Sequence, residues 1–322
     1  MAEPWLPPVD FPAYLEAKIE VDDQSLNPRL LRRVFERVRG LDSPRLLDIG
    51  TGTGAMLRRL LGGPLRERLP AARPQLVGLD VEGQSLEVAA RRIGADLRSA
   101  GWSVEVREEP DRLAIRTTQA DGGPPGPEVL LLRGGLFDPD LDDRLGGVGF
   151  DLLTAHAVLD LMPLEPALGV MRGLLHPGGW LYATINYDGL TVLLPLYDDP
   201  GFEQRLLELY ELSMEQRRVA GQATAGRWSG RRLCAGLPEC GYSILAVGAS
   251  DWTVFPGREG HAEARRLFLR TLLTFMAGEA LAGSELPRAG IERWYRRRLE
   301  ELERGTLALM THQLDVLAET RR

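Results

Sequence analysis

The residues best placed for chemistry form a glycine-rich stretch, DIGTGTG (48–54), which follows a short apolar segment. Glycine at alternate positions lets the backbone turn sharply, and it lets a bulky ligand approach because no Cβ is in the way. Asp48, two residues before the first glycine, can hold a positively charged amine. Asp80 ends the next apolar segment, where a carboxylate can accept hydrogen bonds from both hydroxyls of a ribose. Together these residues predict a nucleoside-like ligand.

Strands and helices are expected to alternate along this part of the chain. Short apolar segments bounded by glycines are typical of strands, and the segments between them carry apolar residues at helical spacing. This alternation predicts an α/β fold with a doubly wound, mostly parallel sheet that has helices on both faces. The segment 103–118 alternates on both sides of Pro110-Asp111 and predicts an inserted β-hairpin. Core strands are expected within 45–50, 75–81, 129–138, 150–162 and 180–188.

The remaining patterns predict how the chain is organised around that core. The stretch 306–318 predicts a last strand that returns to the sheet, and a helix stays open as the alternative. Four parts are expected: an N-terminal arm and cap helix at 1–40, extended over 1–20 and helical from Asn27-Pro28 to Gly40; the ligand-binding core at 41–188; a helical cap insertion at 189–241; and C-terminal strands of the core at 242–322, with helices inserted at 261–303.

Four segments resemble the motifs of the class I S-adenosylmethionine-dependent methyltransferases. DIGTGTG matches the acid-x-Gly-x-Gly-x-Gly motif of this family in full, and GLDVEGQSLEVA (78–89) is similar to its second motif. FDLLTAHAVLDLM (150–162) resembles the fourth strand, and LLHPGGWLYAT (174–184) resembles the helix end, turn and fifth strand. The matches cover residues 45–185 in the family's order. The resemblance implies a seven-stranded Rossmann-like methyltransferase fold, S-adenosylmethionine as cofactor, and methyl transfer to N, O or S of an acceptor.

The resemblance also implies which residues hold the cofactor. In the third motif this family often places an aspartate that binds the adenine amino group, whereas RGGLFD (133–138) has Gly135 at that position and Asp138 three positions later. Adenine binding is therefore expected from the backbone of Leu136 and from packing by Phe137. The cofactor-binding residues implied are Asp48, Gly50, Thr51, Gly52, Gly54, Asp80, Val81, Gly135, Leu136, Phe137, Ala155 and His156.

Two side chains are candidates for a catalytic role. His156 follows the fourth strand, so its ring could face the methyl group, and the alternative is that it contacts the cofactor or a helix without moving a proton. Asp188 leaves the fifth strand toward the same opening and could orient an acceptor, or it could cap a turn. His312, on the expected last strand, is predicted to be a buried structural histidine. No metal site is expected, because the spacing of Cys234 and Cys240 fits neither a CxxC pair nor half of a zinc site.

Composition narrows the function further. Lys18 is the only lysine among 39 basic residues, which excludes a P-loop and leaves no plausible Schiff-base lysine. A net charge of −7 argues against a nucleic-acid partner. No apolar run approaches the length of a membrane helix, and the start of the sequence does not resemble a signal peptide. We therefore expect a cytoplasmic protein that binds neither nucleic acid nor membrane, as a monomer or homodimer.

The expected cap decides between the functions that remain open. A cap would enclose a pocket for a small-molecule acceptor, whereas a protein or RNA methyltransferase needs an open face. A non-catalytic scaffold that binds S-adenosylmethionine or S-adenosylhomocysteine is the alternative from another class. A nicotinamide-dependent dehydrogenase fits less well, because its turn has the form G-x-G-x-x-G.

Overall fold

The computed structural model describes residues 4–66, 73–119, 125–283 and 285–321. In this part of the chain a ten-stranded sheet lies at the centre, in the order β10-β12-β7-β6-β1-β2-β5-β4-β3, with β11 paired to β12. The strands of the sheet are β1 (Arg45–Ile49), β2 (Gln75–Asp80), β3 (Trp102–Glu109), β4 (Arg112–Gln119), β5 (Pro125–Arg133), β6 (Phe150–His156), β7 (Leu175–Leu194), β10 (Tyr242–Ala249), β11 (Trp252–Val254) and β12 (Ala308–Thr320).

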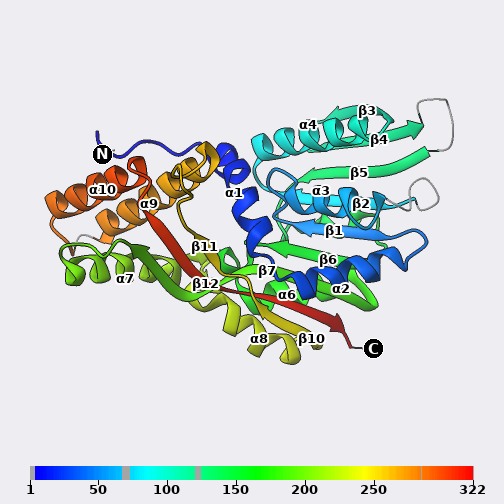
Figure 1. Ribbon diagram of the computed structural model, residues 1–322. Coiled ribbons are helices and arrows are strands. Elements are labelled where there is room, and N and C mark those ends of the chain that lie inside the picture. Colours follow the sequence, from blue (N-terminus) through cyan, green and yellow to red (C-terminus); the bar gives the residue numbers. More distant parts are fainter. Residues whose placement is uncertain (1–3, 67–72, 120–124, 284, 322) are drawn as a thin grey trace.

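The described helices lie on both faces of this sheet and at one of its ends (Figure 1). A separate two-stranded ribbon, β8 (Arg218–Val219) and β9 (Gln222–Ala223), follows the seventh helix. The helices are α1 (Phe11–Ser25), α2 (Pro28–Arg39), α3 (Ala55–Gly62), α4 (Gly83–Ser99), α5 (Leu141–Leu145), α6 (Leu164–Leu174), α7 (Pro200–Gln216), α8 (Ser229–Glu239), α9 (Glu263–Gly283) and α10 (Arg288–Glu303), with short 3₁₀ helices η2 (Leu159–Leu161) and η3 (Gly226–Trp228).

The seven core strands confirm the predicted doubly wound fold. Strands β5, β2, β1, β6 and β7 pair in parallel, and β12 enters antiparallel between β7 and β10. If the seven are numbered along the chain, their order is 3-2-1-4-5-7-6. The predicted hairpin is formed by β3 and β4, which add to the β5 edge in antiparallel fashion. The helical alternative for 306–318 is excluded, because β12 occupies this segment.

Alternating side chains of the buried strands divide the core into two layers. Leu46 of β1 packs into the layer with α2, α3 and α4, while its neighbour Leu47 packs into the layer with α6 and α8. Both leucines are 1% exposed. A parallel sheet covered on both faces needs apolar side chains in both directions, and the RLLDI strand supplies them.

Two predicted segments differ from the structure. The extended arm expected over residues 1–20 is wrong from Phe11 onward, because α1 begins there with Asp10 as its N-cap, whose side chain accepts a hydrogen bond from the Ala13 N–H at 3.1 Å. The fifth strand does not end at residue 188. It continues to Leu194, because β12 pairs with it along its length, with Ala308 opposite Leu194.

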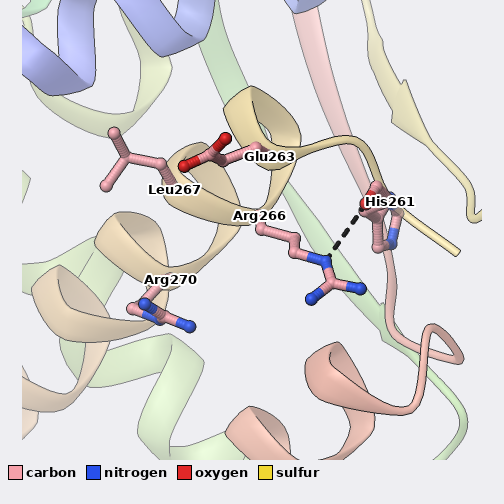
Figure 2. A pocket seen from close by; sticks show the side chains of 5 residues that line it. All are labelled: His261, Glu263, Arg266, Leu267 and Arg270. Atoms are coloured by element: carbon pink, nitrogen blue, oxygen red, sulfur yellow. Dashed lines mark hydrogen bonds between the residues drawn. The ribbon is translucent and has the colours of Figure 1, made fainter.

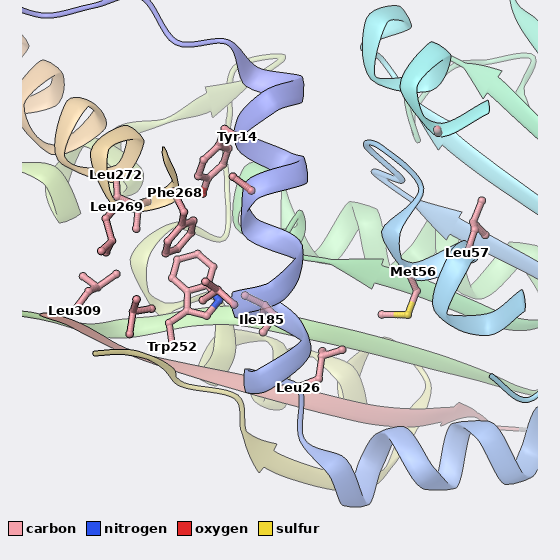
Figure 3. Close-up of a cluster of buried hydrophobic side chains, with 14 of the residues drawn as sticks. Tyr14, Leu26, Met56, Leu57, Ile185, Trp252, Phe268, Leu269, Leu272 and Leu309 are labelled. Carbon is pink, nitrogen blue, oxygen red and sulfur yellow. The ribbon is translucent and has the colours of Figure 1, made fainter. Parts of the chain in front are cut away.

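The helices beyond the core form a cap that α1 joins to the sheet. Helices α7, α9 and α10 pack together at the end of the long β7–β12 pair, and α1 packs against α9 (Figure 1). Aromatic side chains make this junction, as Figure 3 shows: Tyr14 of α1 stacks on Phe268 with ring centroids 5.9 Å apart, and Trp252 meets Phe268 edge-on at 5.1 Å. Across the described residues, we find no helix with the length and apolar character needed to cross a bilayer.

Candidate functional site

A cavity of about 400 Å³ opens at the carboxyl ends of β1, β2, β5 and β6, with α1 along one wall. Its size lies within the range of about 300–1,000 Å³ that is usual for small-molecule sites. Ligands of doubly wound sheets bind at this edge, where the strand order reverses. Nine of the residues predicted from the sequence line it: Gly50, Thr51, Gly52, Asp80, Val81, Gly135, Leu136, Phe137 and His156.

The glycine-rich turn forms the floor of this cavity. Gly50, Gly52 and Gly54 all have positive φ, at 65°, 51° and 80°. Residues with a side chain rarely adopt this conformation. A Cβ on Gly50 would lie 2.5 Å from Val158, and one on Gly52 would lie 2.9 Å from Leu15. The turn therefore requires glycine for both its backbone shape and the space above it.

Asp80 lies at the end of β2 and is linked to the glycine turn. Its carboxylate accepts hydrogen bonds from the N–H groups of Gly52 at 2.7 Å and Glu82 at 2.9 Å. Burial raises the pKa of Asp80, although these backbone donors oppose the shift. The two bonds fix the carboxylate at the cavity wall, where its remaining acceptor positions can meet hydroxyl groups of a ligand.

Asp48 does not line the cavity, although it was predicted to hold an amine there. It is 1% exposed and accepts hydrogen bonds from the hydroxyls of Thr51 at 2.7 Å and Thr154 at 2.6 Å. Burial raises the pKa of Asp48 to about 6. The structure therefore gives Asp48 a positioning role, because it ties the glycine turn to β6 from beneath.

Gly54 and Ala155 also lie outside the cavity lining. Gly54 is the N-cap of α3, and a Cβ on it would meet Ile93 and Ala89 of α4 at 3.1 and 3.2 Å. Ala155 is fully buried within β6. Both residues shape the walls of the site from behind.

The loop after β5 forms the opposite rim, and it carries Gly135 at the position where the resemblance would lead us to expect an acid. The displaced Asp138 turns back on this loop: it accepts a hydrogen bond from the Gly135 N–H at 2.9 Å and lies 3.5 Å from Arg144. Leu136 is buried and Phe137 is 42% exposed, and both line the cavity. Contact with a flat ring at this rim would therefore come from apolar side chains and backbone.

His156 reaches the cavity with both ring nitrogens already bound. Its Nε2 lies 2.9 Å from the Asp22 carboxylate, and its Nδ1 lies 2.6 Å from the Thr184 hydroxyl. Because a carboxylate only accepts, Nε2 carries the proton, and the neutral ring then accepts from Thr184 through Nδ1. Burial lowers the pKa of His156 to about 4, and Asp22 opposes this shift. This arrangement leaves no ring nitrogen free to accept a proton from a substrate.

We expect His156 to stay neutral in the folded protein until the pH falls close to 4. The pKa of His156 in the folded protein lies below the value of about 6.5 that its imidazole has in the unfolded chain. The contribution of this residue to stability is therefore complete above pH 6.5. It is lost as the pH falls from 6.5 toward 4, and it amounts to about 3 kcal/mol. Long-range ¹H–¹⁵N NMR should show the neutral Nε2–H tautomer at pH 6. In His156→Asn the urea midpoint should depend less steeply on pH over this interval. A ring that carries both protons at pH 6 would contradict the assignment.

The sequence reasoning missed two charged residues of the site, Lys18 and Asp22 on α1. The Lys18 ammonium lies 2.8 Å from the Asp22 carboxylate, and the Trp252 indole N–H donates to the same carboxylate at 2.9 Å. The Lys18 ammonium and His156 hold the pKa of Asp22 well below its usual range against the effect of burial. Lys18 and Asp22 both line the cavity. Two features of the sequence could have indicated them. Lys18 is the only lysine, and the two residues have the i,i+4 spacing of a helical ion pair.

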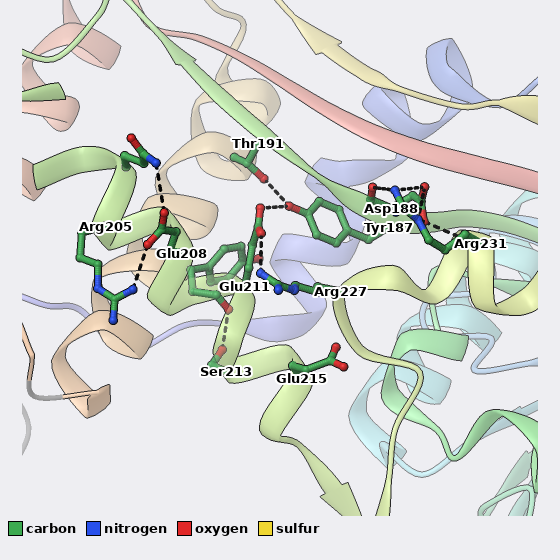
Figure 4. A network of polar contacts seen from close by, with 12 residues as sticks. Tyr187, Asp188, Thr191, Arg205, Glu208, Glu211, Ser213, Glu215, Arg227 and Arg231 are labelled. Carbon is green, nitrogen blue, oxygen red and sulfur yellow. Dashed lines mark hydrogen bonds and ion pairs between the residues drawn. The ribbon is translucent and has the colours of Figure 1, made fainter. Parts of the chain in front are cut away.

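Asp188, the second catalytic candidate, is placed elsewhere. It is 6% exposed and forms a bidentate ion pair with Arg231 of α8, at 2.9 to 3.1 Å (Figure 4). The Arg231 guanidinium in turn lies over the Trp228 ring, 4.0 Å from its centroid. Asp188 thus fastens α8 to β7 and is absent from the cavity lining. His312 is not buried as predicted: its side chain is 36% exposed and bonds Asp251 at 2.9 Å.

A second hollow lies beside α9, and fewer residues line it than line the first cavity. Its side chains come from a short stretch of chain, as Figure 2 shows, and Arg266 donates to the backbone oxygen of His261 at 3.1 Å. Arg266 and Arg270 both pair with Glu303. Among the described residues, no group of three or more His, Cys, Asp or Glu side chains is arranged to hold a metal ion.

Comparisons with known proteins give the following findings. No family model matches the chain, and no curated protein matches its sequence. Solved structures do match. A Thiobacillus denitrificans S-adenosylmethionine-dependent methyltransferase in complex with S-adenosylhomocysteine is 14% identical, with 92% of this chain and 93% of that chain covered and a TM-score of 0.42. A similar complex from Geobacter sulfurreducens is 13% identical, with 92% of each chain covered and a TM-score of 0.40.

The same search also matches the [4+2]-cyclase SpnF, at 18% identity over 91% of this chain and 81% of that chain, with a TM-score of 0.40. At identities below 20% and TM-scores below 0.5, these likenesses do not establish what this chain does.

Proposed function

We propose that this protein is a class I S-adenosylmethionine-dependent methyltransferase that acts on a small molecule. The observation that carries the proposal is the bond between the two motif residues in one cavity, where the Gly52 N–H donates to the Asp80 carboxylate at 2.7 Å. The strand order, with its antiparallel strand between β7 and β10, supports it independently. The family resemblance of residues 45–185 supplies the identity of the ligand.

The residues present fit this cofactor. The positive-φ glycines leave open the space that a Cβ would fill, and Asp80 offers acceptors for ribose hydroxyls. Leu136 and Phe137 supply an apolar rim for the adenine, and the neutral His156 contributes no positive charge at the end of β6. When bound, the cofactor supplies an electrophilic methyl group on a sulfonium. The protein has to align a nucleophile with that group and exclude water.

The cap and α1 support a small acceptor. Helix α1 lies over the cavity with Phe11, Leu15 and Ile19 on its wall, and Leu161 and Met162 after β6 add further apolar surface. A wall of this kind encloses a molecule of limited size, whereas a macromolecular substrate needs an open face. Macromolecular acceptors are therefore the less favoured alternative.

Replacing Asp80 with alanine tests the proposed cofactor site. Hydrogen bonds to a charged group contribute about 1.5–3 kcal/mol, so we expect the affinity for S-adenosylhomocysteine to fall about 10- to 100-fold in Asp80→Ala, measured by isothermal titration calorimetry. The matched control is Asp111→Ala in the exposed turn between β3 and β4, which should bind like the wild type. The proposal is overturned if the wild type shows no binding, or if Asp80→Ala binds as tightly as the control.

A further inference from the structure

The cavity holds a charged cluster that the binding of a nucleoside does not use. Asp80 ends β2, whereas His156 ends β6, and β1 lies between these strands. At about 4.8 Å per strand, the two ends are about 10 Å apart. Lys18 and Asp22 reach the cavity at the His156 side. The nucleoside does not reach this side of the site, whereas the methionine part of the cofactor and the methyl acceptor do, provided that the proposed function holds.

Among the described residues, no titratable side chain on the His156 side of the cavity is free to act as a base. The Asp22 carboxylate already accepts from Lys18, His156 and Trp252. His156 has both nitrogens engaged, and Asp80 and Glu82 lie at the β2 end. An acceptor that arrives with its proton in place would find no group to remove it. The site suits an acceptor whose nucleophilic atom is already deprotonated.

Lys18 is the cation that lines this side of the cavity. Its ammonium is held by a single ion pair, to Asp22, among the described residues, and it lies 5.5 Å from the centroid of the Trp252 ring. An ammonium has three N–H donors, and Asp22 is its one ion-pair partner among the described residues, so Lys18 has capacity to bind an anion in the cavity it lines. Lys18 is 6% exposed, and a buried cation binds an anion more strongly than a surface cation does. A cationic or neutral amine gains nothing from this neighbour.

We propose that the acceptor is an apolar molecule with a carboxylate, and that Lys18 is the residue that binds this carboxylate and selects for it. The apolar part would lie against Phe11, Leu15 and Ile19 on the same helix. In the transfer, one carboxylate oxygen forms the new O–C bond while the S–C bond of the donor breaks and the sulfur keeps the electron pair. No proton is removed, so the absence of a free base is accounted for. The product is a methyl ester.

The test compares ligands that share one skeleton and differ in one group. Binding of 4-phenylbutyrate, 4-phenylbutanol and 4-phenylbutylamine to the protein saturated with S-adenosylhomocysteine is measured by calorimetry, together with decanoate, decanol and decylamine. For at least one skeleton we expect the carboxylate to bind 10-fold or more tighter than its alcohol and amine. In Lys18→Met this preference should fall to about 1, and in Lys18→Arg, which keeps the charge, it should return.

Each result bears on one of the two proposals. If S-adenosylhomocysteine itself fails to bind the wild type, the proposed function fails. If it binds but the carboxylates bind no better than the alcohols or amines, or do not bind, the inference about Lys18 is overturned and the proposed function stands. A preference that survives in Lys18→Met also overturns it. The wild-type comparison does not depend on any variant, so it holds even if Lys18→Met fails to fold.

Discussion

Gly52→Arg should bind S-adenosylhomocysteine at least about 100-fold more weakly than the wild type, a loss of about 2.7 kcal/mol or more. Gly52 has a φ of 51°, and its N–H is one of the donors that hold Asp80. A Cβ at this position would lie 2.9 Å from Leu15 of α1, and the rest of the arginine side chain would occupy the ligand space. Binding would be measured by isothermal titration calorimetry.

The matched control is Gly62→Arg at the end of α3. Gly62 is exposed, and a Cβ there would meet no atom within 4 Å, so this variant should bind like the wild type. Circular dichroism and urea unfolding would show that both variants are folded. Retained affinity in a folded Gly52→Arg would show that the ligand does not lie over the glycine turn.

Arg298→Met should lower the free energy of unfolding by about 3–5 kcal/mol, the usual effect of removing one partner of a buried ion pair. Arg298 belongs to α10, and its fully buried side chain reaches Glu203 of α7. Its guanidinium bonds the Glu203 carboxylate at 2.5 and 2.9 Å, the Glu301 carboxylate at 2.5 Å and the Pro195 carbonyl at 2.8 Å. Methionine would leave the buried Glu203 carboxylate without its counter-charge, while Glu301 would keep only its contact with Arg297 at 2.9 Å. Urea denaturation at pH 7 would measure the loss.

The control for this prediction lies two residues earlier on the same helix. Arg296 is exposed and pairs with Glu292 at 2.6 Å, so Arg296→Met should cost about 1 kcal/mol or less. Equal losses in the two variants would show that the cap does not depend on the buried pair.

The sequence determined the sheet and the part of the site made by the backbone. Its glycines at 50, 52 and 54 permit the left-handed conformations that the turn adopts, and this local property predicts the turn without knowledge of its neighbours. Asp80 could also be predicted from the sequence, because the carboxyl ends of adjacent parallel strands meet at one edge of the sheet. The doubly wound, mostly parallel sheet followed from alternation and from right-handed crossovers, whereas the order of its strands came from the structure.

Only the tertiary structure decided what the charged side chains do. Asp22 and His156 are 134 positions apart, and their contact depends on where α1 lies across the sheet. The role of Asp188 also depended on the tertiary structure, because its carboxylate is paired with Arg231 of α8. Asp48 is held by Thr154 of β6. Backbone conformation is set by neighbours in sequence, whereas the partner of a buried charge is set by whichever element packs over it, and no local pattern records that choice.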